Sequence, residues 1–226
     1  KKLFDTVDER KIHRGIVPRL GGVAFLPALI FSFCLVAGFN LHFHYAEIIP
    51  LTGVVTVPLF FLVCGAMLIY LVGMADDLIG VRYRGKFLLQ IIAAILIMAS
   101  GMWVSDLYGF LWLRSIPAWI GWIITGFCII YVVNAVNLID GIDGLASGLS
   151  AVALGWYSYV FCVYEEYAWM VLSGATLGTL IPFFYYNVFG NPEKQKKIFM
   201  GDTGSLTTGI MLAFLTIAGF NIPEDA

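Results

Sequence analysis

The chain has 226 residues, of which 60% are hydrophobic and only 12% are charged. Soluble domains average about 25% charged residues, and a soluble protein of this length could not keep so much apolar surface from water. The composition therefore excludes a water-soluble fold, and the net charge of −2 argues against a nucleic-acid-binding protein, which needs a basic patch.

Seven apolar stretches follow one another along the chain, and none contains Asp, Glu, Lys or Arg. A helix needs about 20 residues to cross ~30 Å of hydrocarbon, whereas the strands of a membrane barrel alternate in polarity over about 10 residues. The sequence predicts an all-α polytopic membrane protein with about seven transmembrane helices, at residues 21–40, 51–75, 87–104, 118–136, 145–164, 168–187 and 205–220.

The loops between these helices differ sharply in basic residues. With seven helices, the N-terminal segment and the loops 76–86, 137–144 and 188–204 share one side, which holds twelve of the thirteen basic residues. Only Arg114 lies on the other side. Short basic loops stay in the cytoplasm, so this side is predicted to be the cytoplasmic face of the cell inner membrane.

Polar residues gather on the same face. Loop 76–86 reads DDLIGVRYRGK, residues 134–145 read NAVNLIDGIDGL at the end of an apolar run, and residues 188–205 read VFGNPEKQKKIFMGDTGS. Each aspartate in these segments lies where a helix is predicted to meet a loop. The five aspartates are Asp76, Asp77, Asp140, Asp143 and Asp202.

This combination of residue types favours phosphate chemistry. Oxygen ligands in glycine-rich turns suit Mg²⁺ or Mn²⁺, and the nearby Lys and Arg side chains suit phosphate oxygens. Each feature alone has a structural reading: a solvated helix end, a turn, a helix N-cap or a basic cytoplasmic loop. The missing Walker lysine excludes a P-loop. Together on one membrane face, they predict a site for a pyrophosphate substrate.

Four blocks of sequence resemble the polyprenyl-phosphate N-acetylhexosamine-1-phosphate transferase family, of the glycosyltransferase 4 type. They are His13 with PRLGG (18–22), the Asp pair at 76–77 with Lys86, NAVNLIDGIDGL, and FMGDTGS (199–205), and they span nearly the whole chain. The resemblance implies an Mg²⁺-dependent enzyme, with Mn²⁺ as the alternative cofactor. Such an enzyme transfers a sugar 1-phosphate from a UDP-sugar to polyprenyl phosphate at the cytoplasmic membrane face and releases UMP.

The first block separates two branches of that family. PRLGG is similar to the undecaprenyl-phosphate N-acetylglucosaminyl 1-phosphate transferase branch, which serves cell-envelope polysaccharides such as O-antigen. The peptidoglycan-precursor branch, which uses UDP-muramoyl-pentapeptide, usually carries a PTMGG-like motif instead. The expected partners are UDP-sugar, undecaprenyl phosphate and membrane lipid, and a homodimer is left open.

The resemblance also implies roles by position. Catalytic roles fall to Asp76, Asp77, Asp140 and Asp143, metal binding to Asp202 with Asp76 and Asp77, and nucleotide or phosphate contacts to Asn134 and Asn137. From their charge and position, Lys86, Arg82 and Arg14 are the candidates for binding the remaining phosphate charge. Whether Asp76 acts as a metal ligand or as a general base stays open at this point.

Two further expectations concern the extent of the chain and the competing class of protein. The family has more helices on both sides and a His-rich cytoplasmic loop beyond this segment, so residues 1–226 are expected to form one transmembrane catalytic domain without those helices. His42 and His44 fall on the outer face and cannot replace that loop.

A transporter would also have several helices, but its site lies near the bilayer midplane, whereas these carboxylates lie at one interface.

Overall fold

The computed structural model describes residues 4–5, 17–18, 20–43, 53–109, 112, 114–192, 194 and 196–222. A short 3₁₀ turn, η1, leads into the first helix, and two short strands pair antiparallel with Phe4 opposite Pro18. The described part of the chain is otherwise mainly helical, which confirms the predicted all-α class. Its elements are β1 (Phe4–Asp5), β2 (Val17–Pro18), η1 (Gly21–Ala24), α1 (Phe25–His42), α2 (Gly53–Ile79), α3 (Tyr83–Ala99), α4 (Ala118–Ile139), α5 (Leu145–Val163), α6 (Tyr167–Phe189) and α7 (Gly201–Phe220).

Six of these helices are long and apolar enough to cross a membrane: α1 with the η1 turn before it, α2, α4, α5, α6 and α7. The chain is therefore a multi-pass membrane protein. Helix α3 has only 17 residues, which is about 26 Å at a rise of 1.5 Å per residue. The prediction of about seven membrane helices is confirmed as seven helices in the described residues, of which α3 is shorter than the others.

Three helices extend four residues beyond the predicted apolar runs. Helix α2 continues to Ile79 instead of ending at 75, so Asp76 and Asp77 lie in its last turns. Helix α3 begins at Tyr83 and not at 87, and α7 begins at Gly201 and not at 205. The reason is that a run of apolar residues marks only the part of a helix in hydrocarbon, and polar residues continue the helix where partners satisfy them.

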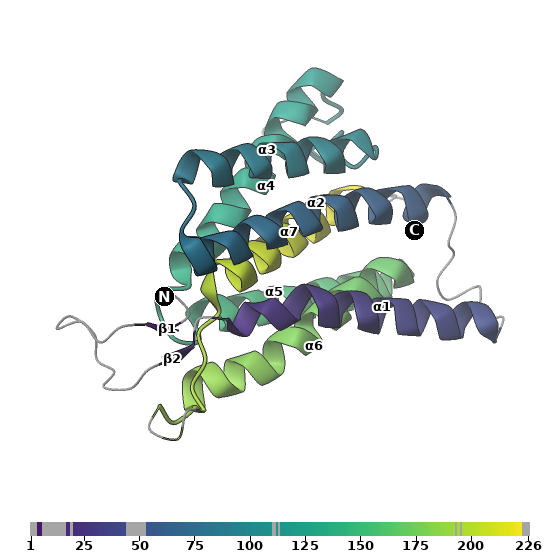
Figure 1. The fold of residues 1–226 in the computed structure, drawn as a ribbon. Coiled ribbons are helices and arrows are strands. Elements are labelled where there is room, and N and C mark those ends of the chain that lie inside the picture. Colours follow the sequence, from purple (N-terminus) through teal and green to yellow (C-terminus); the bar gives the residue numbers. More distant parts are fainter. Residues whose placement is uncertain are drawn as a thin grey trace.

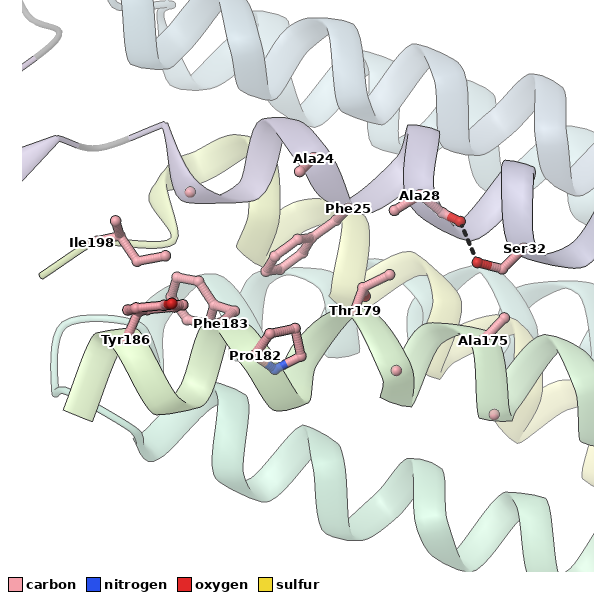
Figure 2. Close-up of a pocket in the computed structure, with 13 residues that line it drawn as sticks. Ala24, Phe25, Ala28, Ser32, Ala175, Thr179, Pro182, Phe183, Tyr186 and Ile198 are labelled. Carbon is pink, nitrogen blue, oxygen red and sulfur yellow. Dashed lines mark hydrogen bonds between the residues drawn. The ribbon is translucent and has the colours of Figure 1, made fainter. Parts of the chain in front are cut away.

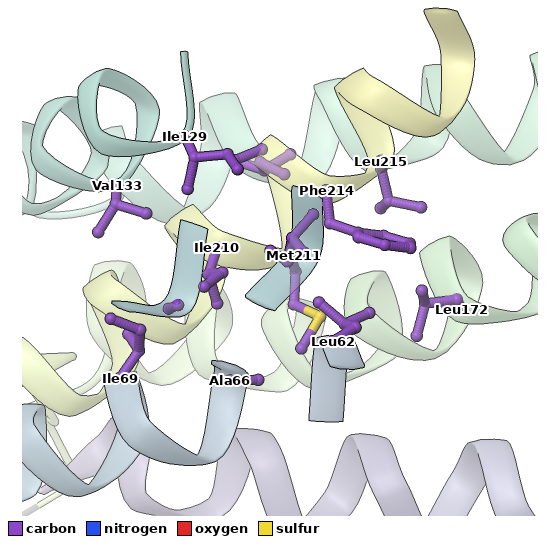
Figure 3. Packing of buried hydrophobic residues seen from close by; sticks show 14 of the residues in the cluster. Leu62, Ala66, Ile69, Ile129, Val133, Leu172, Ile210, Met211, Phe214 and Leu215 are labelled. Atoms are coloured by element: carbon purple, nitrogen blue, oxygen red, sulfur yellow. The ribbon is translucent and has the colours of Figure 1, made fainter. Parts of the chain in front are cut away.

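Helix α7 forms the centre of the bundle. In its most apolar stretch 83% is buried, against 44% or less in every other candidate span. Figure 1 shows α7 running between α2 on one side and α5 and α6 on the other. The core around it joins side chains from α2, α4 and α7, among them Leu62, Ala66, Ile69, Ile129, Val133, Ile210, Met211 and Phe214 (Figure 3). Because α7 is enclosed, its first turn is held in place by its neighbours.

The close approach of α2 to α7 depends on Gly73. A Cβ atom at this position would lie 2.7 Å from the Cα of Thr203 and 2.8 Å from the backbone oxygen of Asp202. We expect Gly73→Ala to push the helices apart and to destabilise the fold by about 1–3 kcal/mol, the usual cost of overpacking. The matched control is Gly38→Ala in α1, where no heavy atom lies within 4 Å. Thermal denaturation of both variants measures the difference, and equal melting temperatures would contradict the contact.

The alternating direction of the helices brings many of their ends together. The C-terminal ends of α2, α4 and α6 and the N-terminal ends of α3, α5 and α7 meet at one end of the bundle, on the left in Figure 1. We call this the polar end. The described basic residues Arg82, Arg84, Lys86, Lys194, Lys196 and Lys197 lie there. Arg114 and His42 belong to the opposite end, as predicted, whereas His44, His13 and Arg14 lie outside the described residues.

Candidate active site

The polar end is organised around an ion-paired lysine. Lys86, in the first turns of α3, donates from Nζ to Asp76 Oδ2 at 2.9 Å and to Asp202 Oδ2 at 2.6 Å. The other oxygen of Asp76 accepts the backbone N–H of Val81 at 2.5 Å, which fixes the carboxylate at the end of α2. The Lys86, Asp76 and Asp202 side chains are 22%, 17% and 26% exposed. These three side chains are therefore partly buried but still accessible to solvent.

Asn137 connects these three side chains to α4. Its Nδ2 donates to Asp202 Oδ1 at 3.0 Å and to Ser205 Oγ at 2.9 Å. Asp202 thus receives donors from α3 and α4 while lying on α7 itself. The structure brings Asp76, Lys86, Asn137 and Asp202 together, and we call these four residues the acid–lysine cluster.

Asp77 is directed away from this cluster, although it neighbours Asp76 in sequence. Its Oδ1 accepts the backbone N–H of Asp202 at 2.8 Å, and its Oδ2 accepts the backbone N–H and the hydroxyl of Thr203 at 2.9 and 2.6 Å. The residue is only 9% exposed. Because the first N–H groups of a helix have no partner inside that helix, Asp77 caps α7 from α2. The two aspartates of the pair therefore have different environments.

Asn134 lies one helical turn before Asn137 and has a different partner. Its Nδ2 donates to Gln90 Oε1 and to the backbone oxygen of Ile130, each at 2.7 Å. Gln90 is 2% exposed and lies one turn after Lys86 on α3. The sequence analysis missed Gln90, although its spacing of four residues from Lys86 places both on one helix face.

The turn between α4 and α5 carries the other two predicted aspartates. Burial first, and then the nearby carboxylates of Asp202, Asp77 and Asp143, together raise the pKa of the Asp140 carboxyl from 3.8 to about 7. Asp143 instead pairs with Lys197, whose Nζ lies 2.5 Å from Asp143 Oδ2. Among the described residues, Asp140 in this turn makes no ion pair, whereas Asp143 is ion-paired to the segment before α7.

The stability of the fold should respond to the charge on Asp140. Its pKa rises on folding from 3.8 to about 7, so the folded state keeps a proton that the unfolded chain has lost. Stability therefore falls as pH rises through this window. In chelator, we expect the parent's melting temperature to fall between about pH 4 and about pH 7, and that of Asp140→Asn to fall less. Thermal denaturation across this range measures both, and equal slopes would contradict a raised pKa.

The predicted phosphate-binding arginines are not part of the cluster. Arg82 is exposed in the turn before α3, and within the described residues no hydrogen bond or ion pair connects it to a carboxylate. Arg14 lies outside the described residues. Two residues missed by the sequence analysis, Asn187 and Lys197, are both buried at the polar end, at 5% and 6% exposed. Lys197 was interpreted there only as part of a basic loop.

The acid–lysine cluster offers a small set of ligands for a cation. Within the described part of the chain, no group of three or more His, Cys, Asp or Glu side chains could hold a metal ion. Asp76 and Asp202 nevertheless converge on one cation, the Lys86 ammonium. Mg²⁺ is often bound by one or two carboxylates and completes its shell with water and substrate phosphates. The donor set therefore fits Mg²⁺ accompanied by a phosphate, and it does not fit a metal site closed by protein ligands alone.

Comparison with known proteins identifies the family of this chain. The model of glycosyl transferase family 4 matches residues 59–220. The chain is 32% identical over 217 residues to a probable undecaprenyl-phosphate N-acetylglucosaminyl 1-phosphate transferase of Bacillus subtilis, and 27% identical over 217 residues to an undecaprenyl-phosphate alpha-N-acetylglucosaminyl 1-phosphate transferase of Yersinia pestis. Both alignments cover 95% of this chain.

A phospho-N-acetylmuramoyl-pentapeptide-transferase of Streptococcus equi subsp. zooepidemicus is 32% identical over an alignment 222 positions long, which covers 89% of this chain and 59% of that protein. The chain covers 55% of the Bacillus and Yersinia proteins, so it spans little more than half the length of these relatives. The matched region 59–220 contains the whole acid–lysine cluster. On this match, the chain belongs to glycosyl transferase family 4.

Proposed function

We propose that this chain carries the active site of an enzyme that transfers a sugar 1-phosphate from a UDP-sugar to polyprenyl phosphate and releases UMP. The observation that carries the proposal is the acid–lysine cluster: two carboxylates, an ammonium and an amide from four helices meet at the polar end of a membrane bundle. The names of the relatives support the same class of reaction. The basic residues of the polar end favour a cytoplasmic site in the inner membrane.

We propose N-acetylglucosamine 1-phosphate as the transferred group. The Bacillus and Yersinia relatives are named for it, and PRLGG at 18–22 resembles that branch. UDP-muramoyl-pentapeptide is the second candidate for the sugar donor, because the Streptococcus relative named for that activity is also 32% identical to this chain. The two candidates share the phosphate chemistry and differ in the group on the phosphate, which is N-acetylglucosamine in one and N-acetylmuramoyl-pentapeptide in the other.

An apolar hollow supports a lipid substrate. It has a volume of about 540 Å³ and lies between α1 and α6, with Phe25, Pro182 and Phe183 in its wall (Figure 2). Tyr186 and Ile198 line it where α6 and the segment before α7 reach the polar end. Small residues of η1, α1 and α6 complete the lining: Gly21, Ala24, Ala28, Ser32, Gly174, Ala175, Gly178 and Thr179. Such a surface suits an isoprenoid chain whose phosphate extends toward the polar end.

In the proposed reaction, an oxygen of the lipid phosphate attacks the β-phosphorus of the UDP-sugar. The bond between the β-phosphorus and the oxygen that bridges to the α-phosphorus breaks, and its electron pair leaves with UMP. The second pKa of a phosphate monoester is about 6, so the attacking phosphate is already mostly dianionic at neutral pH. The main obstacle is repulsion between two anions, and the site must supply positive charge more than a base.

The cluster residues meet that requirement in different ways. Asp76 and Asp202 would hold Mg²⁺, which when bound neutralises pyrophosphate charge. Lys86 would then release these carboxylates and donate to phosphate oxygens. Asn137 keeps Asp202 oriented through its 3.0 Å hydrogen bond. Asp77 contributes to the reaction only indirectly, because it caps the helix that carries Asp202.

A transporter is the competing class, and the position of the charges favours the enzyme. Transport sites lie near the bilayer midplane on broken helices. Among the described residues, the four members of the acid–lysine cluster lie in the end turns of α2, α3, α4 and α7. A site at a membrane surface can take one substrate from water and one from the bilayer.

The test is an assay of membranes containing the protein with polyprenyl phosphate and a panel of radiolabelled UDP-sugars. We expect lipid-linked product and UMP in equal amounts with UDP-N-acetylglucosamine, and neither in chelator. Product only with UDP-muramoyl-pentapeptide would select the second candidate. Transfer that continues at the full rate in chelator would contradict the role given to Asp76 and Asp202.

A further inference from the structure

Two short segments far apart in sequence meet beside the acid–lysine cluster. One is the turn 140–144 between α4 and α5, and the other is the segment 196–200 that leads into α7. Asn187, near the end of α6, lies between them. Its Oδ1 accepts the backbone N–H of Gly144 at 2.7 Å, and its Nδ2 donates to the backbone oxygen of Ile198 at 2.9 Å. One buried amide therefore joins both segments to α6.

A second link lies next to the first in both segments. The Lys197 ammonium is 2.5 Å from Asp143 Oδ2, and Lys197 directly precedes Ile198 as Asp143 directly precedes Gly144. Lys197 is 6% exposed, which is unusual for a lysine that only makes a cytoplasmic loop basic. A buried charge is costly unless it is paired, so this ion pair holds the two segments together.

Backbone contacts fix the remaining sides of these segments. The N–H groups of Gly21 and Gly22 donate to the carbonyl oxygens of Phe199 and Met200, each at 3.0 Å. Gly144 has a φ of +76°, a conformation that glycine adopts without the strain of other residues. A Cβ at Gly144 would also lie 2.6 Å from Val188 Cγ2. The turn 140–144 thus packs tightly against the end of α6 and has little room to shift.

We propose that Asn187, Lys197 and Asp143 form a clamp that positions the turn bearing Asp140 against segment 196–200, which leads directly into the first turn of α7 with Asp202. They are positioning residues for the transfer reaction and do not contact its reacting atoms, so the catalytic part of this inference rests on the proposed function. The ion pair of the clamp, Lys197 with Asp143, is separate from the pairing of Lys86 with Asp76 and Asp202. It reassigns Asp143, for which the sequence resemblance implied a catalytic role, to holding Lys197.

The first arm of the test measures the clamp without any substrate. Asn187→Ala and Lys197→Met are compared with the parent by hydrogen exchange of the full chain in lipid nanodiscs. We expect the Gly144 amide to exchange at least about tenfold faster in Asn187→Ala, while amides in the middle of α7 keep their protection, because only a local opening is made easier. Lys197→Met keeps the side-chain volume and should loosen the same turn. Unchanged exchange of residues 140–146 in both variants would overturn the clamp.

The second arm measures turnover and separates positioning from substrate binding. Lys197→Met should lower kcat about tenfold or more and leave KM for the UDP-sugar within about threefold, because only the alignment of the site is lost. Lys196→Met, an exposed neighbour with the same charge loss, is the matched control and should behave as the parent. A raised KM with unchanged kcat would make Lys197 a substrate ligand and would overturn its positioning role.

A charge exchange tests Asp143 directly. In the double variant Asp143→Lys with Lys197→Asp, the ion pair is restored in the opposite sense, and we expect more protection of residues 140–146 and more turnover than in Lys197→Met. Restored protection without restored turnover would show that the Asp143 carboxylate itself is needed, against the proposal. If the parent has no transferase activity with any UDP-sugar, the proposed function fails, and the exchange arm alone still decides whether the clamp exists.

Discussion

Asp202→Asn is expected to lower turnover about a hundredfold to a thousandfold, the scale of losing a main electrostatic contact in a transition state. Both oxygens of Asp202 are engaged, one by Lys86 and one by Asn137. An asparagine amide keeps the shape but removes the charge, and its NH₂ group would face a donor on one of these sides. The change therefore disconnects Asp202 from Lys86 or from Asn137 and removes a proposed metal ligand.

The same variant should fold normally. The backbone N–H of Asp202, and not its side chain, makes the bond to Asp77, so the cap of α7 does not depend on the Asp202 carboxylate. We expect the melting temperature to stay close to that of the parent and the affinity for Mn²⁺, measured by electron paramagnetic resonance, to fall together with turnover. Asp106→Asn, the same substitution between α3 and α4 at the opposite end of the bundle, is the control. Parent-like Mn²⁺ affinity in Asp202→Asn would show that the metal assignment is wrong.

The apolar runs predicted the helices because each helix must satisfy its own backbone in hydrocarbon. The same runs misplaced one end of each of α2, α3 and α7 by four residues. Asp76 and Asp77 continue α2 because a lysine and the first turn of α7 are there to pair with them. That information lies in other parts of the chain, and a local window of hydrophobicity does not contain it.

The sequence predicted where the site lies, but it predicted the role of each site residue only in part. Alternating helices made it predictable that the aspartates share one end, and Asp76 and Asp202 do meet there. What could not be predicted is which donor each carboxylate finds, because neighbours in sequence such as Asp76 and Asp77 point to different elements. Gln90 and Asn187 are single amides in apolar helices, and their partners become visible only when the helices are packed.

The last prediction separates the two members of the Asp pair by their effect on folding. Asp77 accepts three hydrogen bonds from the first turn of α7 and is 9% exposed. In Asp77→Asn, one amide oxygen can still accept, but the NH₂ group must face an N–H or a hydroxyl of α7. Hydrogen bonds to a charged group contribute about 1.5–3 kcal/mol each, and a buried donor left unpaired costs about as much again. We expect a loss of roughly 2–5 kcal/mol in stability.

Asp76→Asn should give the opposite pattern. Its ion pair with Lys86 is partly exposed, and such pairs contribute about 1 kcal/mol or less, so the melting temperature should change little. Turnover and Mn²⁺ affinity should fall strongly, because Asp76 faces the same cation as Asp202. Asp77→Asn, assayed well below its melting temperature, should keep Mn²⁺ affinity within about threefold of the parent, since it supplies no ligand and α7 remains packed in the core. Thermal denaturation and Mn²⁺ titration of both variants measure these differences. If Asp77→Asn is as stable as the parent but no longer binds Mn²⁺, both aspartates are metal ligands and the cap on α7 is dispensable.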